Sequence, residues 1–406
     1  MSHSYIISNR LNKFPSKVET IVKVLFVLLS VQYVVSHYAA VDVIPTFFLF
    51  LFQSFTILNL ALALLYLRVR WSSYRLVFIL YGFFILFNSL IQNQGNLGDV
   101  LSQFLIYSQV LTAFYLSTID TSFLLGIFRN IALLGIIGFS YIISIEGVDT
   151  DIALQNRGYT FHEMFYYASL FWAVIPAVIL SILYQKNLLI MLLYWILAII
   201  INLIFLKRFI LVDSILLLLV VQFISLIYYK KLISGFKLYF LMASLVGLSL
   251  YSASEIIITL FEATNERIES SFDDLSGVDR FVEYRNYFEK EATIIDLLIG
   301  KGIASFHKGL GVEAYSIHTG WANFIFKGGV IWFVLILVPF FKMISLIGKF
   351  KKLPVDIQFS VSLLLINVPR FFYTNMDNFQ PVMLVFFYAL FKVADYKHSK
   401  FTLPVV

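Results

Sequence analysis

The sequence predicts an all-α, polytopic membrane protein with about 12 transmembrane helices and one large extracytoplasmic loop. Three observations predict this class. Apolar residues make up 60% of the 406-residue chain and charged residues only 13%, whereas a soluble domain carries about 25% charged residues. The mean hydropathy is +0.87. Apolar runs of about 20 residues recur along the chain, and each is long enough to cross a hydrocarbon core roughly 30 Å thick.

Helices explain these runs better than barrel strands. Backbone groups in lipid must be hydrogen-bonded within a helix or within a closed barrel. Barrel strands alternate apolar and polar residues over about ten positions, whereas segment 44–67 is uncharged and mostly apolar throughout. A basic segment with Arg10, Lys13 and Lys17 precedes the first run, which has no good small-residue cleavage site and is interpreted as a retained span. The predicted spans are 18–37, 43–67, 75–92, 99–117, 123–144, 164–184, 187–206, 208–228, 237–261, 320–347, 355–372 and 379–395.

The distribution of basic residues predicts the orientation of these spans. With the N-terminus in the cytoplasm, the cytoplasmic segments and adjoining span ends hold 16 basic residues, and the short outer loops hold three. Because basic residues concentrate on the cytoplasmic side, both chain ends are expected to be cytoplasmic. The loops 145–163 and 262–319 then share the outer face. The cytoplasmic set is Arg10, Lys13, Lys17, Arg68, Arg70, Arg75, Lys186, Lys230, Lys231, Lys237, Lys349, Lys351, Lys352, Lys392, Lys397 and Lys400, and the outer set is Arg157, Lys207 and Arg208.

Composition also excludes several kinds of chemistry. The chain has no cysteine, which removes disulfides, thiolate nucleophiles and cysteine-bound metals. The net charge of +6 comes mostly from short loops that set the topology, so it does not predict nucleic-acid binding. No internal repeat of the kind common in transporters is visible in the sequence.

Basic residues at the outer face are candidate ligands for an anionic group. Arg157 carries a rigid fork of donors that suits a phosphate or a carboxylate, or it lies among lipid head groups. Lys207 and Arg208 stand at the outer start of span 208–228, where they either snorkel to the interface or serve a function. Asp213, further into that span, is a candidate partner of Arg208.

The large outer loop has 58 residues, 11 of them acidic, and contains a predicted helix. Phe281, Tyr284 and Phe288 recur at helical spacing, which predicts an amphipathic helix packed on the protein or on the membrane surface. Arg280 and Arg285 flank that face. They form either an ordinary solvated surface or a clamp for an anionic head group such as a diphosphate.

His318 is the main candidate for proton transfer, because an imidazole exchanges a proton near neutral pH and this one stands where the large loop re-enters the membrane. A lone histidine is otherwise a structural residue. No second histidine or acidic cluster at metal-ligand spacing surrounds it, so no metal site is predicted. Tyr315 and Asn323 flank it as candidate substrate-binding residues. Upstream, Gly300-Lys301-Gly302 is either a turn or a close backbone approach to a ligand, and it lacks the pattern of a nucleotide-binding loop.

Together these motifs resemble the O-antigen polymerase and ligase superfamily of bacterial envelope polysaccharide assembly. The resemblance rests on motif order over residues 150–345. The chain departs from the family pattern at Thr319, where asparagine commonly follows the histidine. In order, the motifs are the Arg157-Gly158 loop, the Lys207-Arg208 pair, Arg280 opening a loop helix, Gly300-Lys301-Gly302, His318 with Asn323 five residues later, and Gly328-Gly329 in the next span.

This resemblance implies glycosyl transfer from an undecaprenyl diphosphate-linked glycan at the outer face of the bacterial inner membrane, without a metal or other cofactor. Arg157, Arg208, Arg280 and Arg285 would hold the diphosphate, and His318 would accept or steer the acceptor proton. A polymerase would join lipid-linked repeat units into O-antigen or capsular polysaccharide. The implied partners are the lipid-linked donor and acceptor, membrane lipid and a chain-length regulator protein, and nucleic acid is not among them.

Three alternatives stay open at the level of the sequence. A ligase of the same superfamily would transfer the glycan to lipid A core. A lipid-linked glycan flippase or another transporter would place charged residues deep in several spans around a cavity. A structural scaffold would leave His318, Arg157 and Arg280 without a role. The polymerase is preferred because the chain consists of spans and one large loop, with no evident docking surface for a core oligosaccharide.

Overall fold

The computed structural model describes residues 72–92, 124–133, 173–184, 208–229, 285–302, 305–308, 320–368 and 381–396, together with isolated positions that include 283 and 317. At 92, 208–215, 229 and 381–384 it describes the backbone only. The chain divides into two compact units, Met1–Arg70 and Trp71–Val406. All features below belong to the second unit, and the prediction of one transmembrane domain over 1–406 stays a prediction.

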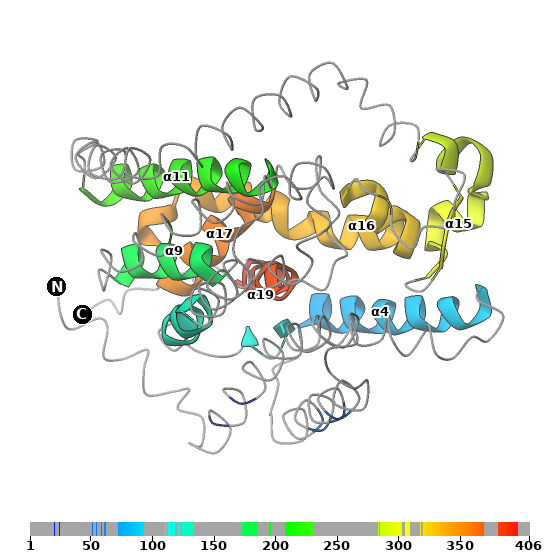
Figure 1. Ribbon diagram of the computed structural model, residues 1–406, viewed down its shortest axis with the longest axis horizontal. Coiled ribbons are helices and arrows are strands. Elements are labelled where there is room, and N and C mark those ends of the chain that lie inside the picture. The colour runs from blue at the N-terminus through cyan, green and yellow to red at the C-terminus, as the bar shows by residue number, and fades with distance from the viewer. Residues whose placement is uncertain are drawn as a thin grey trace, which may run out of the picture. The chain divides into compact units, whose positions relative to one another are not determined.

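Every element of the described residues is a helix, which confirms the all-α class for this part of the chain (Figure 1). An unlabelled helical segment, Leu124–Leu133, adds to the labelled ones. The labelled elements are α4 (Ser73–Gln92), α9 (Val174–Tyr184), α11 (Arg208–Tyr229), the π-helix η2 (Tyr287–Glu291), α15 (Ile294–Ile299), α16 (Gly320–Ile347), the 3₁₀-helix η3 (Phe350–Lys352), α17 (Val355–Asn367) and α19 (Pro381–Asp395).

Two helices are long and apolar enough to cross a membrane, Ser73–Ile91 and Gly320–Ile347. They coincide with the predicted spans 75–92 and 320–347. Shorter apolar helices lie within four further predicted spans: Leu124–Leu133, Val174–Tyr184, Leu216–Tyr228 and Val355–Asn367. The predicted spans 18–37, 43–67, 99–117, 187–206 and 237–261 lie almost wholly outside the described residues, so the number of spans stays a prediction.

Helices α16 and α17 make most of the contacts between described helices. Helix α16 packs against α4, α15, α17 and α19, and α17 packs against α9, α11 and α19. Aromatic rings fill the junction of α4, α16 and α19. The fully buried ring of Phe78 on α4 lies 4.2 Å from that of Trp332 on α16 and 5.2 Å from that of Phe391 on α19. These tilted and edge-on contacts suit the charge distribution of aromatic rings.

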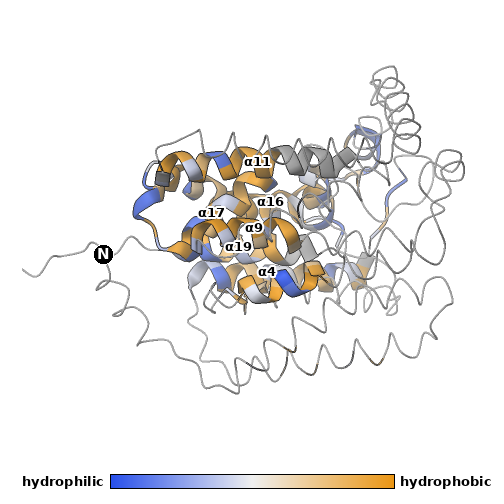
Figure 2. Ribbon diagram, turned by 60° about the vertical axis from the view of Figure 1, so that its left-hand side comes forward, coloured by the Kyte–Doolittle hydropathy of each residue, from blue (hydrophilic) through white to orange (hydrophobic). Residues whose placement is uncertain are grey.

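The outward faces of the long helices are apolar, and buried positions include polar residues. On α4, Leu80, Phe87 and Ile91 are 59%, 66% and 76% exposed, whereas Asn88 on the same helix is buried. On α16, Phe341 is 68% exposed. Figure 2 shows that both helices are hydrophobic along most of their length. Exposed apolar stripes of this size are unfavourable in water but suit helices that contact lipid.

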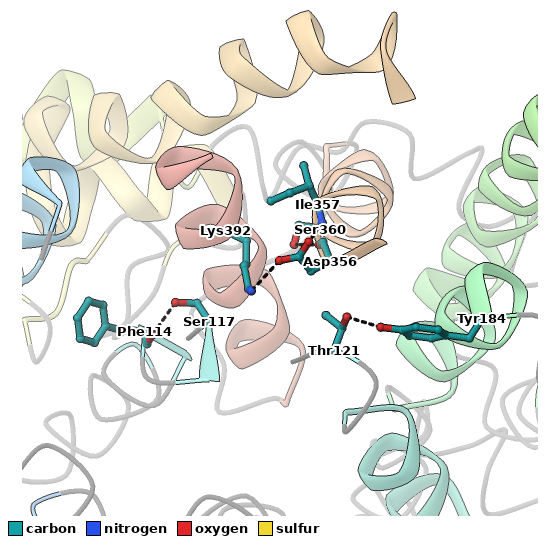
Figure 3. A network of polar contacts seen from close by, with 8 residues as sticks. All are labelled: Phe114, Ser117, Thr121, Tyr184, Asp356, Ile357, Ser360 and Lys392. Atoms are coloured by element: carbon teal, nitrogen blue, oxygen red, sulfur yellow. Dashed lines mark hydrogen bonds and ion pairs between the residues drawn. The ribbon is translucent and has the colours of Figure 1, made fainter. Parts of the chain in front are cut away.

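Ion pairs join the ends of α4, α17 and α19. Arg75, near the start of α4, contacts Asp395 at the end of α19. Lys392 Nζ on α19 lies 2.9 Å from Asp356 Oδ2 in the first turn of α17, and the two side chains point toward each other in Figure 3. The charge distribution of the sequence assigns all three helix ends to the cytoplasmic side.

Candidate functional site at the broken helix α16

Helix α16 is interrupted at Gly329, whose backbone is non-helical with φ 70° and ψ −179°. A positive φ of this kind favours glycine, which has no Cβ to clash with its own backbone. The interruption, here called the helix break, separates segment 320–328 from segment 330–347. Carbonyl groups that end a helical segment inside a membrane need donors from elsewhere in the protein.

Segment 300–302, here called the glycine loop, supplies two of these donors. The Lys301 N–H donates to Phe326 O at 2.8 Å, and the Gly302 N–H donates to Lys327 O at 2.9 Å. The large loop therefore forms backbone hydrogen bonds with the span into which it leads.

Helix α4 holds both the helix break and the glycine loop. The Tyr81 hydroxyl donates to Gly328 O at 2.9 Å. The Asn88 side-chain amide donates to Gly300 O at 2.6 Å, and this bond is buried. Tyr81 and Asn88 are seven residues apart, which is close to two helical turns, so both lie on the same face of α4. One helix face thus fixes two segments that are far apart in the sequence.

Glycines are needed here because the backbones approach closely. A Cβ at Gly300 would lie 2.4 Å from Lys327 O, and a Cβ at Gly329 would lie 2.2 Å from Leu298 O. Real side chains do not show contacts this short. The Gly-x-Gly segment and the Gly pair, both part of the family resemblance, therefore have a packing role in this chain.

A buried acid–base pair lies beside the glycine loop. His307 Nε2 is 3.3 Å from Glu283 Oε1, and both side chains are fully buried. The imidazole of His307 also lies edge-on to the rings of Tyr287 and Phe326, with ring centres 6.0 Å and 5.2 Å away. The pair joins two parts of the large loop to α16. Sequence reasoning missed it because nothing in the spacing of Glu283 and His307 indicates that they meet.

Tyr287 lies in the apolar cluster between the large loop and α16, with Ile317 and Phe326 among its neighbours. Its ring centre is 5.0 Å from that of Phe326. Among the described residues its buried hydroxyl has no hydrogen-bond partner. Burial, assisted by the negative charges of Asp296 and Glu291, raises the pKa of Tyr287.

Two lysines lie at the carbonyl end of segment 320–328. Lys327 is 4% exposed and donates to Ser305 O at 3.2 Å. Lys301 Nζ lies 5.3 Å from the ring centre of Tyr287, within cation–π range. Cations at a helix C-terminus interact favourably with the helix dipole. Sequence reasoning did not single out Lys327, although an ionisable residue inside a predicted span is a recognisable signal.

Asn323 anchors the segment that contains the candidate histidine. Its side chain is 1% exposed, and its Oδ1 accepts a hydrogen bond from the Ile317 N–H at 2.9 Å. Ile317 directly precedes His318, which itself lies outside the described residues. The structure therefore gives Asn323 an internal partner, and its predicted contact with substrate stays a prediction.

Arg285 is an exposed residue of the large loop. Its Nε lies 3.0 Å from Glu289 Oε1, and the two side chains are 70% and 56% exposed. This is a solvated ion pair one helical turn apart, the simpler of the two readings that the sequence allowed. Phe288, from the predicted amphipathic pattern, stacks on Trp321 at the start of α16, with ring centres 6.0 Å apart.

The other predicted site residues are not placed. Arg208 begins α11, but its side chain is outside the described part. Within the described residues, no group of three or more His, Cys, Asp or Glu side chains could hold a metal ion. The remaining residues outside the described part, whose roles stay predictions, are Arg157, Lys207, Arg280, Tyr315 and His318.

No protein-family model, curated protein or solved structure matches the chain. The resemblance to the O-antigen polymerase and ligase superfamily therefore rests on motif order alone. The class that the structure itself defines is coarser: a helical protein with helices able to span a membrane and a polar loop hydrogen-bonded to a broken helix.

Proposed function

We propose that the chain polymerises undecaprenyl diphosphate-linked oligosaccharide repeat units by glycosyl transfer at the outer face of the bacterial inner membrane. The ordered set of motifs described above supports this proposal. The single observation that carries it is the hydrogen bond between Asn323 and Ile317. It fixes the residue before His318 where the loop enters α16, and a group that transfers a proton needs such fixed placement.

In the proposed reaction a hydroxyl oxygen of the acceptor glycan attacks the anomeric carbon of the donor. A bond from that carbon to the acceptor oxygen forms, and its bond to the diphosphate oxygen breaks. Arg157, Arg208 and Arg280 neutralise the departing diphosphate, and His318 takes the hydroxyl proton. Arg285 belongs to this clamp only if its surface pair with Glu289 opens.

A second candidate function is transport of a lipid-linked glycan, and one observation favours it. Transporters commonly bind their substrates at interrupted helices, and α16 is interrupted at Gly329. However, Phe326 O, Lys327 O and Gly328 O all accept hydrogen bonds from protein groups. Carbonyls that already have protein donors are poorly available to a transported ligand, so the enzyme is preferred.

The test uses the full-length protein purified into lipid and supplied with an undecaprenyl diphosphate-linked repeat unit and no other acceptor. We expect the wild-type protein to form a ladder of longer lipid-linked glycans. We expect His318→Ala to lose the ladder. His398→Ala is the matched control, because it makes the same substitution in the predicted cytoplasmic C-terminal segment, and it should keep full activity.

The other outcomes separate the alternatives. A ladder from both wild type and His318→Ala would keep the polymerase and remove His318 from the chemistry. No ladder, followed by transfer of the glycan to added lipid A core, would identify a ligase instead. No transfer to either acceptor from folded protein would favour a transporter, which a flipping assay in the same vesicles would detect.

A further inference from the structure

We infer that α15 is immersed in the membrane, with Ile294, Ile295 and Leu298 in contact with lipid hydrocarbon. These three side chains are 78%, 65% and 51% exposed. They lie on one face of the helix, at positions i, i+1 and i+4. The inference does not depend on the proposed glycan chemistry and requires only that α4 and α16 cross a membrane.

The polarity of α15 is inverted relative to a helix in water. Its one charged residue, Asp296, is only 7% exposed. The Asp296 carboxylate accepts hydrogen bonds from the N–H and the hydroxyl of Thr293, at 2.9 Å and 2.8 Å. This capping box satisfies the carboxylate locally. A helix that hides its acid and exposes its isoleucines is favoured where the surroundings are apolar.

Helix α15 packs against α16 partway along the length of both long helices. The carbonyl of Leu298 packs directly against Gly329 at the helix break. Next to the break, Gly328 O accepts a hydrogen bond from Tyr81, which lies in the middle of α4. Helices α4 and α16 are both long and apolar enough to cross a membrane. The helix break, and α15 with it, therefore lies at a depth that both helices cross.

Helix α16 carries an exposed apolar stripe that starts next to the point where α15 packs. The stripe begins beside Gly329 with Val330 and Ile331, which are 41% and 42% exposed. It continues one and two turns further along with Val334 and Val338, at 49% and 44%. Because α15 packs at the depth of this stripe, lipid, which would cover the stripe of a spanning helix, is also the occupant of the exposed α15 face.

The absence of native cysteines makes a direct test possible. Single cysteines replace Ile294, Ile295 or Leu298 in the full-length chain and are labelled with a nitroxide. Glu289→Cys, at a 56% exposed charged position of the same loop, is the matched control. The proteins are reconstituted in vesicles of phosphatidylethanolamine and phosphatidylglycerol. Collision with oxygen, which concentrates in hydrocarbon, is compared with collision with a water-soluble nickel chelate.

We expect the three α15 labels to collide strongly with oxygen and to lose most of the nickel collision seen at Glu289→Cys. Nickel collision equal to that of the control would place α15 in water and overturn the inference. Low collision with both reagents would mean that protein covers the face, and would overturn it too. Three independent positions keep the test decisive if one variant fails to fold.

Discussion

At the scale of single residues, the Tyr287 hydroxyl, which has no hydrogen-bond partner in the part of the chain that the structure describes, predicts an unusual response to substitution. A buried hydroxyl without a hydrogen bond is unfavourable, so Tyr287→Phe is expected to be neutral or slightly stabilising at neutral pH. The pKa of Tyr287 is raised in the folded protein. The unfolded chain therefore releases this proton near pH 10, before the folded chain does. As the pH rises above about 10, the wild type should lose stability relative to the variant.

The measurement is the free energy of unfolding of both proteins from pH 8 to 11 in the same detergent. Other tyrosines and lysines titrate in this range in both proteins, so only the difference between them reports on Tyr287. A difference that stays constant above pH 10 would contradict the prediction.

Asn88 predicts the opposite effect, because its side-chain amide donates a buried hydrogen bond to Gly300 O. Removing the donor to Gly300 O by Asn88→Ala leaves a buried carbonyl with one bond fewer, which typically costs about 1–3 kcal/mol of stability. Ser345→Ala is the control, because its hydroxyl bonds within α16 at an exposed position. Denaturant titration in mixed micelles should show a loss for Asn88→Ala and almost none for Ser345→Ala. Equal losses would show that the bond to the glycine loop contributes nothing specific.

At the scale of elements, α4 also supplies a hydrogen-bond donor at a second irregular point of α16, Pro339. Pro339 has no N–H, so the carbonyl of Leu335 one turn earlier lacks its helical donor. The Tyr74 hydroxyl of α4 donates to Leu335 O at 2.8 Å. Tyr74 and Tyr81 are seven residues apart on one face of α4. Their hydroxyls donate hydrogen bonds to α16 at its two irregular points, Pro339 and the helix break.

This arrangement predicts a specific double-mutant cycle. Tyr74→Phe should lower the free energy of unfolding by about 1 kcal/mol in the wild-type background. In a Pro339→Ala background the restored N–H can bond to Leu335 O, and the same substitution should cost little. The cycle is measured by unfolding the four proteins under one condition. Equal costs in both backgrounds would show that the hydroxyl does not compensate for the proline.

The helix break predicts a contrast between two glycines. Gly329→Ala would bring its Cβ to 2.2 Å from Leu298 O at a positive φ, so we expect a loss of several kcal/mol or failure to fold. Gly126→Ala is the control, since nothing lies within 4 Å of its Cβ position in the segment Leu124–Leu133. That change should be neutral or stabilise by up to about 1 kcal/mol. Similar folded yields and stabilities for both variants would contradict the role of Gly329.

At the scale of the whole molecule, two long-range side-chain hydrogen bonds join helix ends that the predicted topology assigns to one side. Thr121 bonds to Tyr184 with 2.7 Å between hydroxyl oxygens (Figure 3), and the Tyr228 hydroxyl bonds to Gln358 at 2.5 Å. All four residues stand at predicted cytoplasmic ends. Asn88 and the glycine loop meet at the predicted outer side. The side of the membrane that each end faces stays a prediction.

Cysteine labelling in cells tests that assignment. Glu289→Cys in the large loop should react with a membrane-impermeant maleimide added to intact spheroplasts. Lys351→Cys, an exposed position on η3, should react only after the membrane is permeabilised. The reverse pattern would put the large loop in the cytoplasm and remove the basis for glycan transfer at the outer face.

The sequence by itself determined the helical class and the bounds of several helices. It could do so because burial in lipid imposes a long apolar run on each spanning helix, and such a run is local. The ends of α4 and α16 fall within two residues of the predicted spans 75–92 and 320–347. Motif order also directed attention to the segments 300–302 and 327–329, which the structure brings into contact.

Only the tertiary structure decided what those segments do to each other. The hydrogen bonds of the glycine loop, the pairing of Glu283 with His307 and the two tyrosines of α4 all join residues far apart in the chain. Partners of this kind are chosen by packing between helices, and no local pattern of residues encodes them. Likewise, the sequence shows that α15 is apolar, but only its packing on α16 shows that Asp296 faces inward and the isoleucines outward. The hydrophobic pattern of the sequence determines which segments can enter a membrane. Contacts between helices determine which polar groups are hydrogen-bonded within the protein and which can bind a ligand.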